Sequence, residues 1–306
     1  MKAGIIVNPQ SGRRRAGELL RKLEAACATL ELDAHVYLWE EPGGMDRLVQ
    51  QALEAGCTAL VAAGGDGTVH QLGTRLISGT VPLGIIPAGT GNALAHHFGI
   101  PHDLPACLRL IQAGHVERID TATVNGHPFL AFMGVGLDAE VIHRYARVNR
   151  RNFITYAWHS LNLFVRNRPL DVRLHLPDQV IDWRVTFLSV MNIQEFGLHA
   201  RIAPGASAVD GRLDVVRVWV PGLGRAPGFL WRLFRGHLRT AAPYYQRFDV
   251  PSLVIERQQA GLAQIDGEAI ELEARLAVEV VPASLPVLAN RSAPALRSGN
   301  QQPVQL

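Results

Sequence analysis

Short apolar runs that end in glycine-rich turns organise the first 120 residues of the chain. Residues 58–63 and 82–86 are two such runs, and they lead into GGDGT at 64–68 and PAGTGN at 87–92. The run at residues 3–7 ends in NPQSG at 8–12. Apolar runs of this length, each closed by turn residues, are typical of strands buried on both faces. The pattern predicts three such strands, each delivering its end to a turn.

Helix-like segments follow these strands. Leucines at 19, 20, 23 and 30 place an apolar stripe along residues 16–32. Further helices are predicted over residues 43–55, 68–77, 92–98 and 104–112, with one more strand at 34–38. Strands that alternate with helices predict an α/β domain with a parallel sheet covered on both faces. Ligands of such sheets bind at the carboxyl ends of the strands, which is where the three glycine turns fall.

The pattern changes after Asp120. Short strand-like runs now follow one another, separated by turn pairs such as Asn125-Gly126. The predicted strands are residues 121–124, 128–135, 170–176, 183–192, 213–220, 252–256, 262–265 and 275–281, with helical insertions near 137–164 and 228–240. This pattern predicts an antiparallel β-sandwich. We therefore expect an α/β nucleotide-binding domain over residues 1–120, an all-β domain over 121–289 and a flexible tail over 290–306.

Composition narrows the class of protein. Of the 306 residues, 48% are apolar and 19% are charged, which is ordinary for a folded protein with a large core. The net charge of +3 is too small to indicate a nucleic-acid partner. Three cysteines in no disulfide or zinc spacing favour a reducing cytosol. The first residues carry no signal-peptide pattern, and no run of 18 apolar residues predicts a membrane span.

The glycine-rich turns suit a phosphate ligand. Glycine lets backbone N–H groups approach phosphate oxygens where a Cβ would clash, and the following helix begins with unpaired N–H donors. Asp66 lies between two glycines of the GGDGT turn. Because a carboxylate repels a phosphate, Asp66 either acts through a divalent cation, orients a donor, or caps the helix that follows. These interpretations stay open.

The chain resembles the diacylglycerol kinase catalytic domain family, which also holds sphingosine kinases and bacterial lipid kinases. The resemblance rests on NPQSG at 8–12, GGDGT at 64–68, PAGTGN at 87–92, Asp120, DGRLDV at 210–215 and DGE at 266–268, in this order along nearly the whole chain. It implies a phosphofructokinase-like N-terminal α/β domain with a parallel sheet and a C-terminal antiparallel β-sandwich that serves the lipid substrate. It also implies ATP and Mg²⁺ as cofactors.

The resemblance implies a role for each motif. Residues of the three turns would surround ATP: Asn8, Pro9, Ser11, Gly12, Gly64, Gly65, Asp66, Gly67, Thr68, Gly89, Thr90, Gly91 and Asn92. Asp66 would also support the magnesium–phosphate network. Asp266 or Glu268 would be the general base that takes the proton from the lipid hydroxyl. A carboxylate suits that task, because phosphoryl transfer needs mainly positioning and charge neutralisation.

A structural magnesium is a further implication of the resemblance. Asp210 would supply a carboxylate, and the backbone carbonyls near Leu213 and Val215 would complete an oxygen-rich site. Both Asp210-Gly211 and Asp266-Gly267 are also strong hairpin signals, so a purely structural turn stays open for each. Asp138 follows a glycine-rich strand end and is a further candidate for lining a cleft.

The implied function is Mg²⁺-dependent transfer of the γ-phosphate of ATP to a hydroxyl of diacylglycerol or a related lipid. One residue departs from the family pattern: Ala93 stands where many bacterial members carry Asp. This thins the carboxylate network around the nucleotide. The alternatives are an NAD kinase-like enzyme, against which NPQSG and the PAGTGN spacing argue, and a catalytically weak nucleotide- and lipid-binding protein.

Residues 225–240 carry a separate hypothesis. On a helix, one face gathers the arginines and the other the apolar residues: Arg225, Arg232, Arg235 and Arg239 against Leu230, Leu233, Phe234 and Leu238. Either the apolar face packs on the sandwich, or the arginines contact anionic headgroups while Phe229 or Trp231 enters the interface. We expect a cytoplasmic protein, peripherally bound to an anionic membrane surface. Its partners would be ATP and the lipid substrate, with a homodimer left open.

Overall fold

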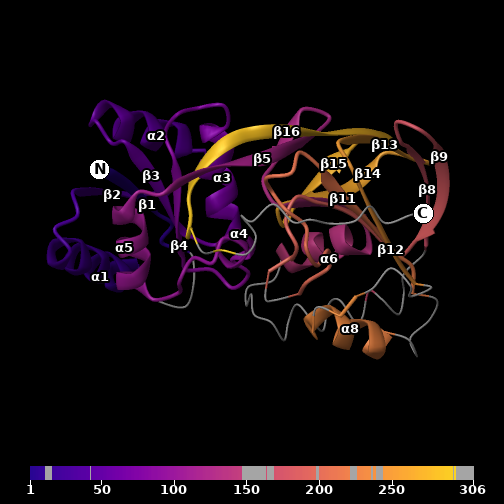
Figure 1. Cartoon of the computed structure of the whole chain (residues 1–306), viewed down its shortest axis with the longest axis horizontal. Helices are drawn as coiled ribbons and strands as arrows, with labels where there is room; N and C mark the ends of the chain where they lie inside the picture. The colour runs from indigo at the N-terminus through magenta and orange to yellow at the C-terminus, as the bar shows by residue number, and fades with distance from the viewer. Residues whose placement is uncertain are drawn as a thin grey trace. The chain divides into compact units, whose positions relative to one another are not determined.

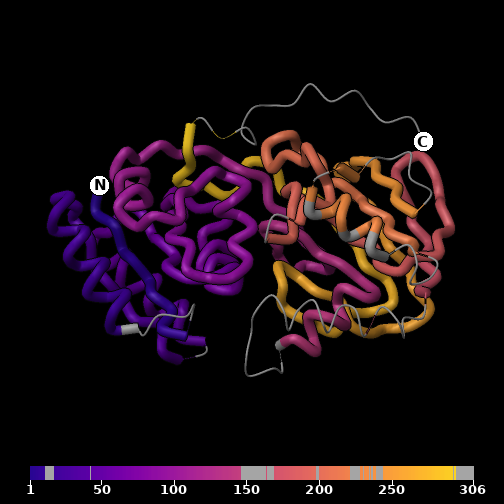
Figure 2. Tube along the Cα trace, turned by 90° about the horizontal axis from the view of Figure 1, so that it is seen from below, coloured from indigo at the N-terminus to yellow at the C-terminus, as the bar shows by residue number. Residues whose placement is uncertain are grey.

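A computed structural model describes residues 1–10, 16–41, 43–146, 163, 169–197, 200–220, 226–235, 237–238, 244–291 and 293. Within these ranges the chain forms two compact units (Figures 1 and 2). The first unit comprises Met1–Asp120 together with residues 282–291 and 293 of the described chain, and the second comprises the described residues of Thr121–Val281.

The first unit is an α/β structure. In chain order its elements are β1 (Ala3–Val7), α1 (Ala16–Thr29), β2 (Ala34–Leu38), α2 (Met45–Glu54), β3 (Ala59–Gly64), α3 (Asp66–Leu76), β4 (Leu83–Pro87), α4 (Ala93–His97) and α5 (Leu104–Ala113). The strands form a parallel sheet in the order β2-β1-β3-β4. Helices α1 and α5 pack together, as do α2 and α3 (Figure 1). The predicted parallel α/β sheet is confirmed.

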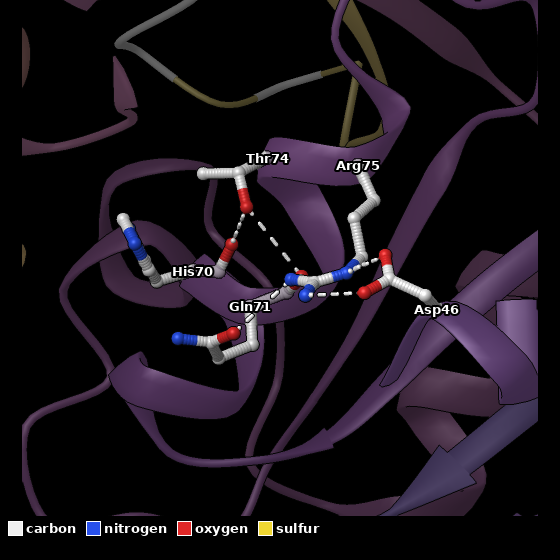
Figure 3. A network of polar contacts seen from close by, with 5 residues as sticks. All are labelled: Asp46, His70, Gln71, Thr74 and Arg75. Atoms are coloured by element: carbon white, nitrogen blue, oxygen red, sulfur yellow. Dashed lines mark hydrogen bonds and ion pairs between the residues drawn. The ribbon is translucent and has the colours of Figure 1, made fainter. Parts of the chain in front are cut away.

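Helix α3 leads away from the GGDGT turn and is joined to α2 by an ion pair. Arg75 donates to both oxygens of Asp46, at 2.6 and 3.1 Å, and to the Gln71 carbonyl at 2.6 Å (Figure 3). The Asp46 side chain is 75% exposed, so this pair contributes about 0.5 kcal/mol at most. Burial of Leu72 and Leu76 holds the helix more strongly.

The described residues of the second unit form mainly β-strands, together with helices α6 and α8. Its elements are β5 (Val116–Val124), β6 (His127–Phe129), β7 (Phe132–Gly136), α6 (Leu137–Ala146), β8 (Leu170–His175), β9 (Val180–Val185), β10 (Phe187–Met191), β11 (Leu213–Val218), α8 (Ala226–Arg235), β12 (Tyr245–Val250), β13 (Ser252–Arg257), β14 (Gly261–Ile265), β15 (Glu268–Leu272) and β16 (Arg275–Leu288). One antiparallel sheet has the order β12-β11-β10-β7-β14-β15. Strands β16, β13, β8 and β9 pair antiparallel in a second layer. Side chains from both layers share one core, so the predicted sandwich is confirmed.

Two predicted strands are broken in the structure. The run at 128–135 becomes β6 and β7, and the run at 183–192 becomes β9 and β10. Strand β9 pairs with β8, whereas β10 pairs with β7 and β11, so the chain changes layers at Thr186. The Thr186 hydroxyl accepts the Val220 N–H at 3.0 Å and stabilises this crossing. An apolar run alone does not reveal such a change of layer.

Strands β5 and β16 each begin in one unit and end in the other. The sequence pattern places residues 282–289 in the second domain. In the structure they belong to the first unit, where Val287 pairs with Leu83 of β4 and the Ser284 carbonyl accepts the Ser78 N–H at 2.7 Å. Most of the predicted tail, from residue 294, lies outside the described residues.

Candidate active site

Three turns meet at the carboxyl ends of β1, β3 and β4, because these strands are neighbours in the sheet. The Asn8 side-chain amide donates to the Thr68 hydroxyl at 3.1 Å, which joins NPQSG to GGDGT. The Ala88 N–H donates to the Gly64 carbonyl at 2.9 Å, which joins GGDGT to PAGTGN. Residues that the sequence predicts as one nucleotide site are therefore in contact within the first unit.

The first turn is described only in part. Asn8 accepts the Gln10 N–H on its side-chain oxygen at 2.9 Å, which folds the chain around the half-buried Pro9. Ser11 and Gly12, predicted as phosphate contacts, lie outside the described residues.

Asp66 connects the second turn to the third. Its Oδ2 accepts the Asn92 N–H at 2.8 Å, and its Oδ1 accepts the Ala93 N–H at 2.7 Å. Asp66 itself is the first residue of α3, so its side chain satisfies the N-terminus of a different helix, α4. Both carboxylate oxygens are thus engaged with backbone donors, and Asp66 acts in this structure as a bridge between turns.

Close packing of the turns accounts for several glycines. A Cβ on Gly89 would lie 2.4 Å from the Gly65 Cα, and a Cβ on Gly91 would lie 2.3 Å from the Asp66 Oδ2. A Cβ on Gly64 would lie 2.3 Å from the Thr68 hydroxyl oxygen. The glycines are therefore required for contact between turns, in addition to any approach by a phosphate.

Asn92 closes the third turn in the left-handed conformation, with φ of 53°. Its side chain accepts the Gly89 N–H at 3.0 Å and donates to the Gly89 carbonyl at 2.8 Å. Thr90 is exposed at the tip of this turn. Within the described part of the chain, the N–H groups of Gly67, Thr90 and Gly91 donate to no backbone oxygen outside regular elements, so they remain available for an anionic ligand.

Asp266 is buried in the second unit and fully engaged. Its carboxylate accepts the N–H groups of Leu130, Ala131 and Phe132 at 2.8, 2.8 and 3.0 Å. Leu130 and Ala131 separate β6 from β7, and Phe132 is the first residue of β7, so these hydrogen bonds explain why the predicted 128–135 strand is broken. Asp266 lies in the β14–β15 turn with φ of 47°, as the hairpin interpretation predicts. Its oxygens are directed at backbone donors rather than solvent.

Glu268 differs from Asp266 in the exposure and the hydrogen bonding of its carboxylate. It is exposed at the start of β15, and no contact within the described chain engages its carboxylate. Gly267 lies between the two acids with φ of 85°, and its N–H donates to the Gln264 side-chain oxygen at 3.1 Å. Sequence reasoning missed Gln264, because a single glutamine in a strand carries no local signal.

The DGRLDV segment offers one accessible carboxylate. Asp210 is exposed, and one of its oxygens accepts the Arg212 N–H at 3.0 Å. Leu213 is buried in β11 and pairs with β12. Val215 pairs with both β12 and β10, so the backbone of Val215 lies between two paired strands. Among the residues that the structure describes, no group of three His, Cys, Asp or Glu side chains could hold a metal ion.

Asp214, in the same segment, forms a buried ion pair that the sequence did not indicate. Its carboxylate accepts from Arg247 at 2.6 Å, and Arg247 also donates to the Pro204 carbonyl. Burial raises the pKa of Asp214 to about 6, and the attraction of Arg247 offsets this only in part. This pair stabilises the β11–β12 region from within.

Two family models match the chain. Residues 2–124 match the diacylglycerol kinase catalytic domain, and residues 131–289 match the YegS C-terminal NAD kinase beta sandwich-like domain. A probable lipid kinase YegS-like protein of Pseudomonas aeruginosa (strain UCBPP-PA14) is 30% identical over 292 residues, 94% of each chain. The chain also spans 52% of one longer curated relative.

Solved structures share the fold. A diacylglycerol kinase from Bacillus anthracis superposes with a TM-score of 0.73 at 20% identity, over 95% of this chain and 98% of that one. An NAD kinase from Archaeoglobus fulgidus, solved with ATP, gives a TM-score of 0.52 at 15% identity over 94% of each chain. Fold and turns together define a two-domain kinase of the diacylglycerol kinase class. Within that class, the chain belongs to the YegS-like lipid kinase family, whose two domains it carries in order.

Proposed function

We propose that this protein transfers the γ-phosphate of ATP to a hydroxyl group of diacylglycerol or a related lipid, with Mg²⁺ accompanying the nucleotide. The observation that carries the proposal is the meeting of three glycine-rich turns at the ends of neighbouring parallel strands, in a member of a lipid kinase family. The family model for the first unit is named for diacylglycerol kinase, which supports that lipid class as the acceptor.

The phosphates of ATP would bind to backbone rather than to side chains. The N–H groups of Gly67, Thr90 and Gly91 supply donors, and Asn8 and Thr68 supply polar side chains beside them. Ser11 and Gly12, which the family resemblance assigns to the same site, lie outside the described residues. Asp66 contributes by holding GGDGT against PAGTGN, so that donors from both turns are already arranged before the nucleotide arrives.

Glu268 is our proposed general base, because its carboxylate is exposed and free of hydrogen bonds to the described chain. The lipid hydroxyl oxygen forms a bond to the γ-phosphorus while the bond from that phosphorus to the β–γ bridging oxygen breaks. The hydroxyl proton passes to Glu268, and ADP leaves with the bridging oxygen. Asp266 holds the turn that carries Glu268 and does not itself accept the proton, since three N–H groups already occupy its oxygens.

Mg²⁺ finds few ligands in the described residues. The Asp66 oxygens face backbone donors, and Asp210 offers a single exposed carboxylate. These side chains do not fit a resident metal cage, so we propose that Mg²⁺ is brought by the phosphate oxygens of ATP. Asp210 remains our candidate for a separate structural ion. Ala93 adds no carboxylate ligand for Mg²⁺, and only its backbone N–H takes part in the Asp66 bridge.

Helix α8 is the proposed contact with an anionic membrane surface. Leu233 is buried against the sandwich, as the packing interpretation predicts for the apolar face. Phe229 is also buried, beside Phe187, so the prediction that Phe229 enters a membrane interface is wrong. Trp231 is 57% exposed, and the Arg235 guanidinium lies over its ring at 5.7 Å. A tryptophan beside arginines suits the interface with anionic headgroups. Arg225 and Arg239 of the original hypothesis lie outside the described residues.

No helix in the described part of the chain is long and apolar enough to cross a bilayer. In our proposal the protein meets its lipid acceptor at the membrane surface. The proposed chemistry does not require a homodimer. Cytosolic, peripheral membrane association is part of the proposal.

A phosphate-transfer assay tests the proposal. Purified protein is incubated with Mg²⁺ and ATP labelled in the γ-phosphate, together with mixed micelles of diacylglycerol, monoacylglycerol, sphingosine, ceramide or phosphatidylglycerol, and with NAD as a soluble acceptor. We expect label on one glycerolipid and none with E268Q. Label on NAD alone would establish the NAD kinase-like alternative. No label on any acceptor, with ATP binding intact, would establish the catalytically weak binding protein instead.

A further inference from the structure

A row of three aligned residues crosses the centre of the six-stranded sheet in the second unit. Gly134 of β7 is paired in register with Ser189 of β10 on one side and with Gln264 of β14 on the other. A Cβ on Gly134 would lie 1.9 Å from the Asp138 Oδ2 and 3.1 Å from the Gln264 side-chain nitrogen. Gly134 therefore leaves a space in the sheet, and the Asp138 carboxyl group from α6 fills it.

The donors that contact the Asp138 side chain from the described residues are all neutral. The Ala139 N–H donates to Oδ1 at 2.8 Å, the Ser189 hydroxyl donates to Oδ2 at 3.3 Å, and Gln264 Nε2 lies 3.5 Å from Oδ2. Burial raises the pKa of Asp138 to about 7, and these hydrogen bonds oppose that shift without cancelling it. The charge on this carboxyl group therefore changes near neutral pH.

Few ionisable groups surround this site. Helix α6 packs against β7, β14 and β15. Strands β7 and β14 carry no ionisable side chain, and β15 carries Glu268 and Glu271. Asp266 follows β14, and α6 itself adds Glu140, His143, Arg144 and Tyr145, but none of these groups contributes to the pKa shift of Asp138. The carboxyl group titrates according to its own burial.

Gln264 extends from this carboxyl group to the turn before Glu268. It is 1% exposed, and its two polar atoms face opposite ways: Nε2 toward Asp138 and Oε1 toward the Gly267 N–H. An ionised carboxylate only accepts hydrogen bonds, so it favours the amide orientation that leaves Oε1 for Gly267. A protonated Asp138 loses its hold on Gln264 and donates to Ser189 instead.

We propose that Asp138 is a positioning residue for phosphate transfer, which orients Gln264 so that Gln264 holds the Gly267 N–H and fixes the direction of Glu268. This inference rests on the proposed function, because it takes Glu268 as the base. Asp138 touches neither substrate in the proposal and acts only through Gln264. The turn is then held at two residues. The Asp266 carboxylate accepts the Ala131 N–H, and the Gly267 N–H donates to Gln264.

Kinetics of three variants test the proposal. D138A and Q264L each remove the link, and we expect kcat to fall about tenfold in each with little change in KM, because a misdirected base slows the chemical step. The double variant D138A/Q264L should be no slower than Q264L, since both act through one chain of contacts. D138N can direct its one side-chain oxygen at Gln264, with its NH₂ group then facing the Ala139 N–H, and should restore much of the kcat that D138A loses. It should also abolish the fall in kcat that we expect of the wild type as the pH drops below 7.

A second readout does not need turnover. Hydrogen exchange at the Gly267 amide, followed by NMR, should be faster in D138A and Q264L and close to wild type in D138N. T186V is the matched control, because it removes another buried hydrogen bond of the same unit, to the Val220 N–H. It should cost stability without altering Gly267 exchange or the pH profile.

The two failures are distinguishable. If E268Q retains turnover, the assignment of the base is wrong whatever Asp138 does. If E268Q is inactive while D138A keeps wild-type kcat, pH profile and Gly267 exchange, the positioning role is overturned and the proposed function stands. Additive losses in D138A/Q264L would overturn it equally, because independent effects need no shared contact.

Discussion

Asp66 and Asn92 are 26 residues apart in the chain, and the Asp66 carboxylate accepts the Asn92 N–H at 2.8 Å. The adjacent Ala93 N–H donates to the other oxygen of the same carboxylate at 2.7 Å. The acidic residue of GGDGT thus binds two backbone donors of the neighbouring turn. It joins the two turns that we propose as the phosphate site.

D66N should weaken ATP binding and stability together. An asparagine can accept one of the two N–H groups, but its own NH₂ then faces the other donor. We expect a loss of roughly 2 kcal/mol in the free energy of unfolding. The ATP affinity, measured by calorimetry, should fall about tenfold as the turns separate. D46N is the control, because it breaks an exposed ion pair of the same unit (Figure 3). Unchanged ATP affinity in D66N would contradict the bridging role.

G91A tests whether contact between turns requires the glycine. The new Cβ would lie 2.3 Å from the Asp66 Oδ2, so the carboxylate must move and lose a backbone donor. We expect a destabilisation of about 1–3 kcal/mol in denaturant unfolding and weaker ATP binding. G17A serves as control, since nothing lies within 4 Å of a Cβ there and the position is in helix α1. A wild-type melting temperature and ATP affinity in G91A would show that the turns move apart freely.

E268Q and D266N should separate chemistry from structure. E268Q removes an exposed carboxylate, so the free energy of unfolding should change by less than about 0.5 kcal/mol. In contrast, kcat should fall about 10²–10⁴-fold as the base is lost. D266N keeps a residue type that tolerates φ of 47° but disturbs three backbone hydrogen bonds, so roughly 3 kcal/mol of stability should be lost. The reverse pattern would make Asp266 the base.

D138N should change how stability depends on pH. Burial raises the pKa of Asp138 from its ordinary value of 3.8 to about 7, so between these values the folded state holds a proton that the unfolded state has released. Stability of the wild type therefore falls across this range as the pH rises. D138N lacks this titration, and its advantage over the wild type should grow from pH 4 to 7 and reach about 2–4 kcal/mol. Parallel curves for the two proteins would contradict the buried titration.

R235E should weaken binding to anionic vesicles about tenfold, because the reversed charge beside Trp231 repels the headgroups. Co-sedimentation with phosphatidylglycerol vesicles measures this, and neutral vesicles should bind both proteins equally weakly. R184E is the charge-matched control, since Arg184 on β9 is also exposed. Equal losses in both variants would indicate a general effect of net charge rather than a contact by α8.

The sheet of the first unit and its turns could be predicted because their signals are local. An apolar run such as residues 59–63 and the glycines after it define a buried strand and its turn without reference to the rest of the chain. The break between β6 and β7 could not be predicted in this way. It depends on Asp266, which is 135 residues from the Ala131 N–H that it accepts.

In the candidate site, too, some features follow from local sequence patterns and others are revealed only by the fold. Motifs indicated which residues gather, but the hairpin and catalytic interpretations of Asp266-Gly267 could not be separated by spacing alone. Three buried backbone donors engage Asp266, while Glu268 is exposed two residues later, and only the fold reveals that difference. Gln264 and Ser189 gave no signal at all, because their importance comes from their register beside Gly134.

The path of β16 has a consequence for biosynthesis. The first unit contains residues 1–120, yet Val287, which pairs with its strand β4, is translated only after the whole of Thr121–Val281. Two further contacts form only once Ala283 has been translated. Arg118 donates to the Ala283 carbonyl, and the Asp120 carboxylate accepts the Ala283 N–H. Nascent chains usually fold from the N-terminus onward. Here the sheet of the first unit can be completed only after Thr121–Val281 has been translated, so a chain interrupted before residue 282 carries complete glycine turns on an incomplete sheet.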